Sequence, residues 1–284
     1  MLERFKSDSG LMGPSHAMSA IAMTLLLTLF ASEFMFKTLL GTNDFVVYIT
    51  VIIIVVGASL MPDLDASTST SINVLGIIGS NLSTVMRAFS KIIQSTIRSK
   101  SDKPSPDPHR GFWHTILAAF IAGGLVLLLT SFSIPLFEVM GVKFDSSMLF
   151  VIFIIYISIK LLTASLIKSV VKKYKGNFLA NTIINLISLL IAVILTTSGP
   201  EGLDFKWVAV AVTLGWLCHL VGDMMTVAGV PILAPFIKFK GKRWWMFRFP
   251  FGIKAGGWIE MSILNPLFLI VAIVSAVFVI PMLS

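Results

Sequence analysis

All four histidines of this 284-residue chain lie near the ends of hydrophobic segments and within a few residues of a charged side chain. Together with nearby aspartates, the candidate metal ligands are His16, Asp63, Asp65, His109, His114, His219 and Asp223. Imidazoles and carboxylates without thiolates suit borderline divalent cations such as Zn²⁺ or Mn²⁺, and they suit Ca²⁺ poorly. Seven ligands are more than one tetrahedral zinc needs, so these residues predict a site for two divalent ions.

Two pairs have a spacing that favours a metal site. His219 and Asp223 are four residues apart and share a helix face, where they either bind a metal or form a simple imidazole–carboxylate hydrogen bond. Ionisable groups inside a membrane are costly and usually line a functional cavity, which favours the metal. Asp63 and Asp65 follow Pro62, which ends a helix, so both project from a turn. The negative end of the helix dipole is unfavourable for carboxylates there, and a bound cation would offset this repulsion. The alternative is that both aspartates are solvated at an ordinary helix end.

The segment HRGFWH brings His109, Arg110 and His114 to the start of another hydrophobic segment. Asp107 is the expected N-cap of this helix and Pro108 its first residue. On a regular helix Arg110 and His114 share a face, whereas His109 points about 140° away from His114. His109 then reaches the same site only from a frayed first turn, or as the ligand of a second metal. Arg110 either holds a phosphate or carboxylate substrate through its planar guanidinium or contacts lipid headgroups.

The candidate catalytic residues are Asp65, Arg110 and Glu260. Glu260 begins the last hydrophobic segment, where it is expected to be a general base, to support a metal ligand from behind, or simply to favour a helix N-terminus. We favour the supporting role. For His16, the only support for a role as a metal ligand is its expected side and depth in the membrane.

The elements that must position these residues are membrane-spanning helices. With 56% hydrophobic residues and a mean hydropathy of +0.93, the chain is expected to be an all-α polytopic membrane protein with a single domain over residues 1–284. Seven segments are apolar over about 20 residues, the length that spans a bilayer. They cover residues 17–36, 45–61, 112–131, 148–167, 178–197, 207–226 and 262–282. In segment 72–98 apolar residues recur at three- and four-residue steps, which predicts an amphipathic helix on the membrane surface.

Seven spans place the chain ends and loops alternately on the two sides of the membrane. One side holds residues 1–16, 62–111, 168–177 and 227–261, with 18 of the 22 lysine and arginine residues. The positive-inside rule assigns this side to the cytoplasm, and every candidate ligand lies on it or in the adjoining end of a span. Lys160, inside a span, is expected to extend its ammonium to the interface.

The basic residues do not require a nucleic acid partner. Loops that face anionic lipid headgroups account for the isoelectric point of about 9.7. The segment KFKGKRWWMFRFPF, in loop 227–261, interleaves bases with aromatic residues. Beside a span, this pattern is typical of a membrane-interface belt rather than of a nucleic-acid stacking surface.

The order of these motifs resembles the family of LexA-binding, inner-membrane-associated hydrolases, the YdjM-like proteins. The matching pieces are His16, the PDLD of Pro62 to Asp65, HRGFWHT at 109–115 and HLVGDMMTVAGVPILAPF at 219–236. The resemblance runs from residue 13 to about 260 and implies a multi-span protein of the bacterial inner membrane that acts as a metal-dependent hydrolase. The loop 64–108 looks longer than in that family. The family name suggests a regulatory protein partner, but no residue here indicates a LexA-binding surface.

The prediction is therefore a membrane-embedded hydrolase that uses metal-activated water on a phosphoester, in a lipid or polyprenyl phosphate at the cytoplasmic leaflet. One alternative is a zinc amidase of the ceramidase type, for which Ser15 is the serine beside the metal. Another is a non-catalytic metal-ion carrier or regulatory membrane protein. A carrier needs a polar path, and Asn177, Asn181 and Asn185 share one helix face, although such a stripe more often joins helices.

Overall fold

The computed structural model describes residues 13–66, 70–102, 109–139, 141–166, 178–200 and 203–283. Helices dominate, and two short strands form an antiparallel hairpin before α5. The elements are α1 (Gly13–Phe30), η1 (Phe34–Leu40), α2 (Phe45–Ser59), η2 (Pro62–Asp65), α3 (Thr70–Ile97), η3 (Phe112–His114), α4 (Ile116–Ser131), β1 (Pro135–Val139), β2 (Val142–Asp145), α5 (Ser146–Leu166), α7 (Phe178–Thr197), α8 (Lys206–Met224), η4 (Glu260–Leu264), α9 (Asn265–Val279) and η5 (Ile280–Met282).

The chain is an all-α polytopic membrane protein, as predicted. Six helical segments of the described chain are long and apolar enough to cross a membrane, namely Gly13–Phe30, Phe45–Asp65, Ser146–Ser165, Leu179–Thr197, Lys206–Met224 and Glu260–Met282. The remaining predicted span, residues 112–131, corresponds to α4, which has only 16 residues. At 1.5 Å per residue α4 is about 24 Å long, which is shorter than the hydrocarbon core of a typical bilayer.

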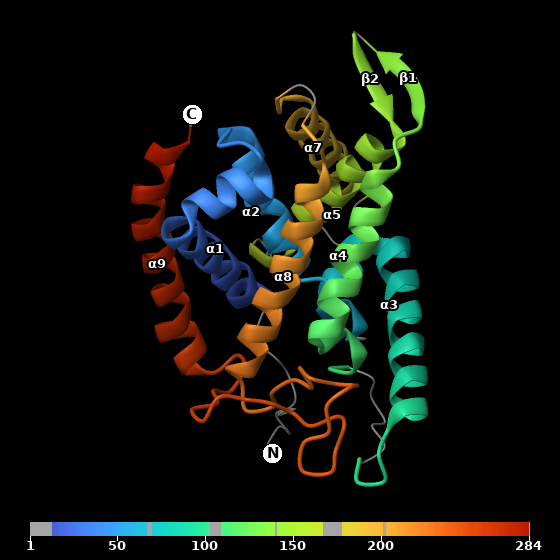
Figure 1. Cartoon of the computed structure of the whole chain (residues 1–284), viewed down its shortest axis with the longest axis vertical. Helices are drawn as coiled ribbons and strands as arrows, with labels where there is room; N and C mark the ends of the chain where they lie inside the picture. The colour runs from blue at the N-terminus through green and yellow to red at the C-terminus, as the bar shows by residue number, and fades with distance from the viewer. Residues whose placement is uncertain are drawn as a thin grey trace.

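Helix α8 lies at the centre of the bundle, where it packs against α1, α2 and α4 (Figure 1). Helix α9 packs on α1, and α5 lies between α2 and α7. The core between these helices is built from aliphatic side chains such as Ile54, Val55 and Val212. By contrast, α7 exposes Leu186, Leu190 and Ile194, which is the surface expected of a helix that faces lipid.

Close contact between α2 and α8 depends on Gly215. A Cβ atom at this position would lie 2.3 Å from the carbonyl oxygen of Val55 and 2.7 Å from the Cβ of Ala58. One turn further along α8, Nδ1 of His219 lies 2.8 Å from the carbonyl oxygen of Ser59 on α2. The glycine therefore sets the distance between α8, which carries His219, and α2, which leads into the turn η2 with Asp63.

We expect Gly215→Ala to push α8 away from α2 and to destabilise the protein by about 1–3 kcal/mol, the usual cost of overpacking a core. The melting temperature in detergent measures this effect. Gly124→Ala in α4 is the matched control, because a Cβ atom there meets no atom within 4 Å. Equal melting temperatures for the two variants would show that the α2–α8 contact is less tight than described.

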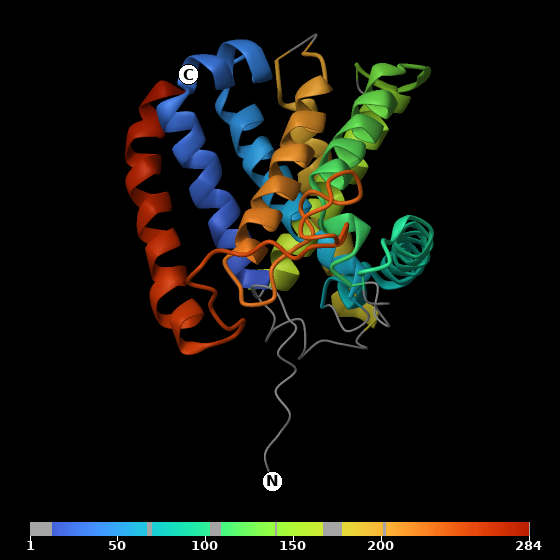
Figure 2. The ribbon, with the colours of Figure 1, turned by 60° about the horizontal axis from the view of Figure 1, so that its bottom comes forward.

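The amphipathic segment predicted at 72–98 is helix α3, interrupted at Gly76, whose φ is +59°. Leu75 and Met86 are buried against the bundle, while Val85 and Phe89 are exposed. In Figure 1 α3 stands upright at the edge of the bundle, and in Figure 2 it is seen almost end-on while α9 is still seen from the side. Helix α3 thus crosses the spans at a steep angle, as expected of a helix that lies along a membrane surface.

The prediction for Lys160 was wrong. Its side chain does not extend to the interface but is only 9% exposed, and its Nζ donates a hydrogen bond to Oδ1 of Asn185 at 2.5 Å. Asn185 also accepts from the Tyr156 hydroxyl at 3.3 Å, so it joins α5 to α7. Asn181 is exposed on α7, and Asn177 lies outside the described residues. A buried lysine is satisfied here by a neighbouring helix, which local sequence does not reveal.

Asp102 links the turn after α3 to the loop after α8 through hydrogen bonds. Its carboxylate accepts hydrogen bonds from the backbone N–H groups of Ser99, Trp244 and Arg243 at 2.7, 3.2 and 3.3 Å, and from the Ser99 hydroxyl at 2.8 Å. Burial alone would raise the pKa of Asp102, but these hydrogen bonds, led by those from Ser99, lower the pKa below its ordinary value.

We expect Asp102→Asn to lower the free energy of unfolding at pH 7 by about 1–2 kcal/mol, since hydrogen bonds to a charged acceptor are lost. The folded pKa lies below the unfolded one, so the stabilisation is fully present above roughly pH 4 and is lost as the pH falls through the folded pKa. Melting curves of wild type and variant should therefore converge in acid. The change Glu138→Gln, at an exposed carboxylate of the hairpin, is the control. A constant difference between wild type and Asp102→Asn at all pH values would contradict this role of the charge.

Candidate metal centre

All seven predicted ligands meet at one end of the helical bundle. His16 lies in the first turn of α1, Asp63 and Asp65 lie on the 3-10 turn η2 that follows α2, and His219 and Asp223 lie in the last turns of α8. His109 and His114 precede α4. The loop between α8 and η4 runs across the same end (Figures 1 and 2). Helices of opposite direction thus bring together side chains as far apart in sequence as His16 and Asp223.

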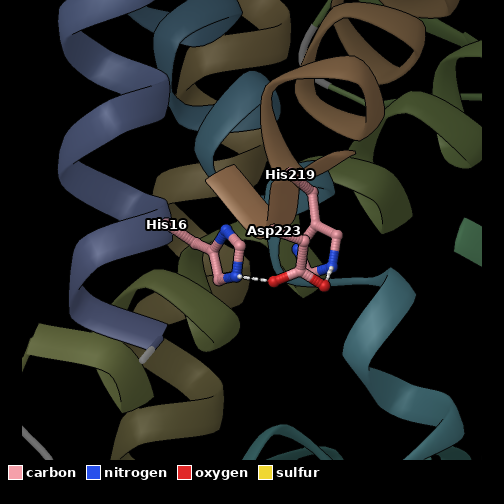
Figure 3. Close-up of side chains that lie close together, drawn as sticks. All are labelled: His16, His219 and Asp223. Atoms are coloured by element: carbon pink, nitrogen blue, oxygen red, sulfur yellow. Dashed lines mark ion pairs between the residues drawn. The ribbon is translucent and has the colours of Figure 1, made fainter. Parts of the chain in front are cut away.

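One cluster consists of His16, His219 and Asp223, all fully buried (Figure 3). Each residue offers one ligand atom, and these atoms lie within 4.8 Å of one another. Nε2 of His16 is 3.4 Å from Oδ1 of Asp223, and Nε2 of His219 is 3.6 Å from Oδ2 of the same carboxylate. The two imidazole rings stack with their centroids 4.0 Å apart. The predicted pairing of His219 with Asp223 across one helical turn is therefore present.

The second cluster consists of Asp63, His109 and His114, whose ligand atoms also lie within 4.8 Å of one another. It adjoins the first one. Oδ1 of Asp63 is 3.7 Å from Nε2 of both His114 and His219, and Nε2 of His114 is 3.7 Å from Oδ2 of Asp223. Two adjacent clusters that share their carboxylates have the arrangement expected of a two-ion site.

Asp65 and Asp63 occupy different places although they are two residues apart. The buried Asp65 carboxylate accepts a hydrogen bond from Nδ1 of His109 at 2.7 Å, and its other oxygen is 3.5 Å from Nδ1 of His114. The Ser59 carbonyl accepts from Nδ1 of His219. A histidine whose Nδ1–H is held by an oxygen presents Nε2 as a lone-pair donor, which is the usual orientation of a metal ligand. Asp65 therefore lies behind two histidines rather than between them.

The electrostatics of the two clusters fit a cation. Within the described residues, Nε2 of His16, His114 and His219 has no hydrogen-bond partner, yet each lies 3.4–3.7 Å from a carboxylate oxygen. A lone pair that faces a carboxylate at this distance is repelled unless a positive charge lies between them. The pKa of His114, in the turn before α4, also indicates that the surrounding carboxylates favour a positive charge. Burial alone would lower the pKa of His114, but the carboxylates led by Asp65 raise it to about 10.

The family follows from comparison with known proteins. The model of the YdjM inner membrane protein family matches residues 11–283. The chain belongs to this family. Its motifs at His16, 62–65, 109–115 and 219–236 all fall within the match, and an inner-membrane family agrees with the six apolar spans. Searches of curated proteins and of solved structures found no match.

The HRGFWH segment of this YdjM family member is not the regular helix start that we predicted. The helix begins at Ile116, where the Thr115 hydroxyl oxygen accepts a hydrogen bond from the backbone N–H of Ala118. Upstream of it, Arg110 adopts a φ of +59°, which is rare for a residue other than glycine. This conformation breaks the helical geometry that would separate His109 from His114, so both reach the site. Asp107 and Pro108 lie outside the described residues.

Arg110 is part of the site rather than a contact for lipid headgroups at the surface. Its side chain is buried, with Nε 3.6 Å from Oδ2 of Asp223 and Nη1 donating to the Gly229 carbonyl at 3.1 Å. Nη2 makes no hydrogen bond within the described part of the chain. A buried guanidinium with a donor to spare beside the two imidazole–carboxylate clusters is well suited to hold an anion.

Glu260 contacts Ser15, the residue that precedes the candidate ligand His16. It lies in the π-helical turn η4, where its two oxygens accept hydrogen bonds from the Ser15 hydroxyl at 2.5 Å and the Gly256 backbone at 2.6 Å. Since Ser15 precedes His16, these contacts join the start of α9 to the turn of α1 that carries a ligand. The sequence carried no sign of the Ser15 contact, or of the Ser59 and Gly229 carbonyls, because only the packing of helices brings them into place.

Proposed function

We propose that this protein is a metal-dependent hydrolase that cleaves the phosphoester of a membrane lipid or polyprenyl phosphate. The observation that carries the proposal is the pair of adjacent imidazole–carboxylate clusters, one fully buried and one partly buried, which are flanked by the Arg110 guanidinium. Divalent ions such as Zn²⁺ or Mn²⁺ bound there would lower the pKa of water to about 7 and neutralise charge on the phosphate.

In this proposal each residue of the site has a defined part. His16, His219 and Asp223 hold one ion, and Asp63, His109 and His114 hold the other, with Asp65 and the Ser59 carbonyl orienting the imidazoles from behind. Arg110 donates from Nη2 to a phosphate oxygen, a contact for which a guanidinium is better shaped than an ammonium. Glu260 and Ser15 position the turn that carries His16.

The exposed surface around the site supports a lipid substrate. The loop between α8 and η4 exposes the apolar side chains of Phe251 and Trp258, while Lys240 and Lys242 lie over the ring of Trp245 at 5.3 and 5.6 Å. Basic and aromatic residues combined in this way are typical of the membrane interface and attract anionic lipid headgroups. The charge asymmetry of the loops supports a position at the cytoplasmic leaflet of the inner membrane.

Assays on a lipid panel test the reaction. Purified protein with Mn²⁺ or Zn²⁺ is incubated with phosphatidic acid, a polyprenyl phosphate and ceramide, and the release of inorganic phosphate and of fatty acid is measured. We expect phosphate release that is lost in Asp223→Asn. Fatty acid release alone would establish the amidase instead, and no product from metal-loaded protein on any lipid would contradict a lipid hydrolase.

The alternatives have weaker support from the geometry. For the amidase, the Ser15 hydroxyl would have to serve the metal, but it donates to Glu260. For an ion carrier, the asparagine face of α7 would have to provide a path, but Asn185 is bonded to Lys160 and Asn181 is exposed. Metal uptake into vesicles that depends on Asn181 would favour the carrier.

A further inference from the structure

A cavity lies at the end of the bundle opposite the candidate metal centre. Its volume is about 510 Å³, and it is formed by residues of α2, β2, α5, α7 and α8. Trp207, in its lining, lies twelve residues before His219 on α8, which is about 18 Å along the helix axis. The cavity is thus separate from the metal centre by more than half of a bilayer's hydrocarbon core, and its volume is in the range of small-molecule sites.

The inner walls of the cavity suit a hydrocarbon chain. Val47 on α2, Met148 and Ile155 on α5, and Leu195 on α7 all line it. The first three are buried core residues. The hydroxyls of Thr196 and Thr197 do not add donors, since each is bonded to the backbone of its own helix, at 2.7 and 2.9 Å.

Within the part of the chain that the structure describes, the indole of Trp207 lacks an acceptor. The residue is only 5% exposed, and within the described chain its Nε1 has no hydrogen-bond partner. The indoles of Trp113 and Trp216 are satisfied differently, by the carbonyl oxygens of Met86 at 2.8 Å and Trp113 at 2.7 Å. A buried indole N–H normally has a partner, because leaving it unsatisfied costs about 1–3 kcal/mol. The cavity is the place from which an acceptor can come.

The charged residues of the cavity lining are Lys143 and Asp145. The carboxylate of Asp145 accepts hydrogen bonds from Ser133, Ser147 and the backbone N–H of Met148 at 2.6, 2.6 and 2.7 Å. The bonds from Ser147 and Met148 cap the start of α5, and the bond from Ser133 occupies the other carboxylate oxygen. Lys143 is exposed and faces Glu138 across the hairpin, but within the described residues it forms no ion pair. It is therefore available to an anionic group.

We propose that this cavity binds an ester-linked anionic glycerophospholipid from the leaflet opposite the metal centre. One acyl chain lies on the aliphatic walls, its ester carbonyl accepts a hydrogen bond from Nε1 of Trp207, and the phosphate lies near Lys143. The apolar walls, the buried indole N–H and the lysine at the rim match the tail, ester and phosphate of such a lipid. This site does not depend on the proposed hydrolase reaction.

Native mass spectrometry of the purified protein in detergent tests the proposal with phosphatidylglycerol and its diether analogue, which lacks the ester carbonyls. We expect wild type to bind the ester lipid roughly tenfold more tightly, the change that 1.4 kcal/mol produces. Trp207→Phe keeps an aromatic side chain but removes the N–H, so this variant should bind both lipids equally. Trp258→Phe, an exposed indole at the other end, should keep the wild-type preference.

Thr197→Trp, at the end of α7, offers a second variant in case Trp207→Phe does not fold. Its indole should fill the cavity from the rim, so that one tightly bound ester lipid per chain is lost. Equal binding of the ester and diether lipids by wild type would overturn the proposal and assign the indole to water. An ester preference that persists in Trp207→Phe would also overturn it, because the carbonyl would then bind elsewhere.

Discussion

Replacing His219 with alanine is expected to reduce hydrolysis of a lipid phosphate by at least about 10³-fold, since several kcal/mol of charge stabilisation depend on the ions. Nε2 of His219 lies 3.6 Å from Asp223 and 3.7 Å from Asp63, so the side chain belongs to the first cluster and touches the second. Its loss should release the ion of the first cluster and leave two carboxylates facing each other. Phosphate release under single-turnover conditions measures the effect.

Cys218→Ala is the control for this change. Cys218 is the neighbouring residue on the same turn of α8, is equally buried and packs in the aliphatic core. It should retain the wild-type rate, which would show that the loss in His219→Ala comes from the imidazole and not from a disturbed helix. Wild-type turnover in His219→Ala would rule out a role for the first cluster in catalysis.

The second large effect is expected at Arg110. Arg110→Lys should lower kcat/KM by roughly 10²–10³-fold, the usual loss when a positioned donor to a developing negative charge is removed. Lysine keeps the charge but loses the planar fork that spans Asp223, Gly229 and the anion. Steady-state kinetics and metal content should be measured together, because we expect the bound metal to remain.

Arg248→Lys is the matched substitution in the adjoining loop. Arg248 is exposed and also donates to a backbone carbonyl, that of Val227 at 2.6 Å, but it lies outside the two clusters. Its replacement should leave kcat/KM within about twofold, as surface changes usually do. If Arg110→Lys were as active as wild type, the guanidinium would have no contact with the phosphate. If instead it lost its metal, Arg110 would be a support for the ligands.

The sequence predicted the helices well where local patterns decide. Apolar length located the spans, and three- and four-residue periodicity located α3 to within two residues of its ends. The spacing of His219 and Asp223 is a local property of a helix, so their proximity was predictable. The convergence of all the candidate ligands followed from counting the spans, because alternate ends of successive helices lie on the same side.

Other parts of the site depend on contacts that no local pattern encodes. Which carboxylate of PDLD faces the cluster is decided by the direction of a 3-10 turn, and it places Asp63 toward the histidines and Asp65 behind them. The conformation at Arg110 is set by surrounding contacts, since its positive φ is unfavourable by itself. The pairing of Lys160 with Asn185 needs the relative rotation of two helices, which sequence spacing leaves open.

The central claim is that the two clusters bind divalent cations, and metal content tests it most directly. Wild-type protein is purified in detergent without chelators, equilibrated with Zn²⁺ or Mn²⁺, desalted and measured by elemental analysis beside Asp223→Asn. The two clusters predict about two ions per wild-type chain, and fewer in the variant because Asp223 serves one cluster and borders the other. A wild-type protein that retains no divalent metal under these conditions would contradict the account.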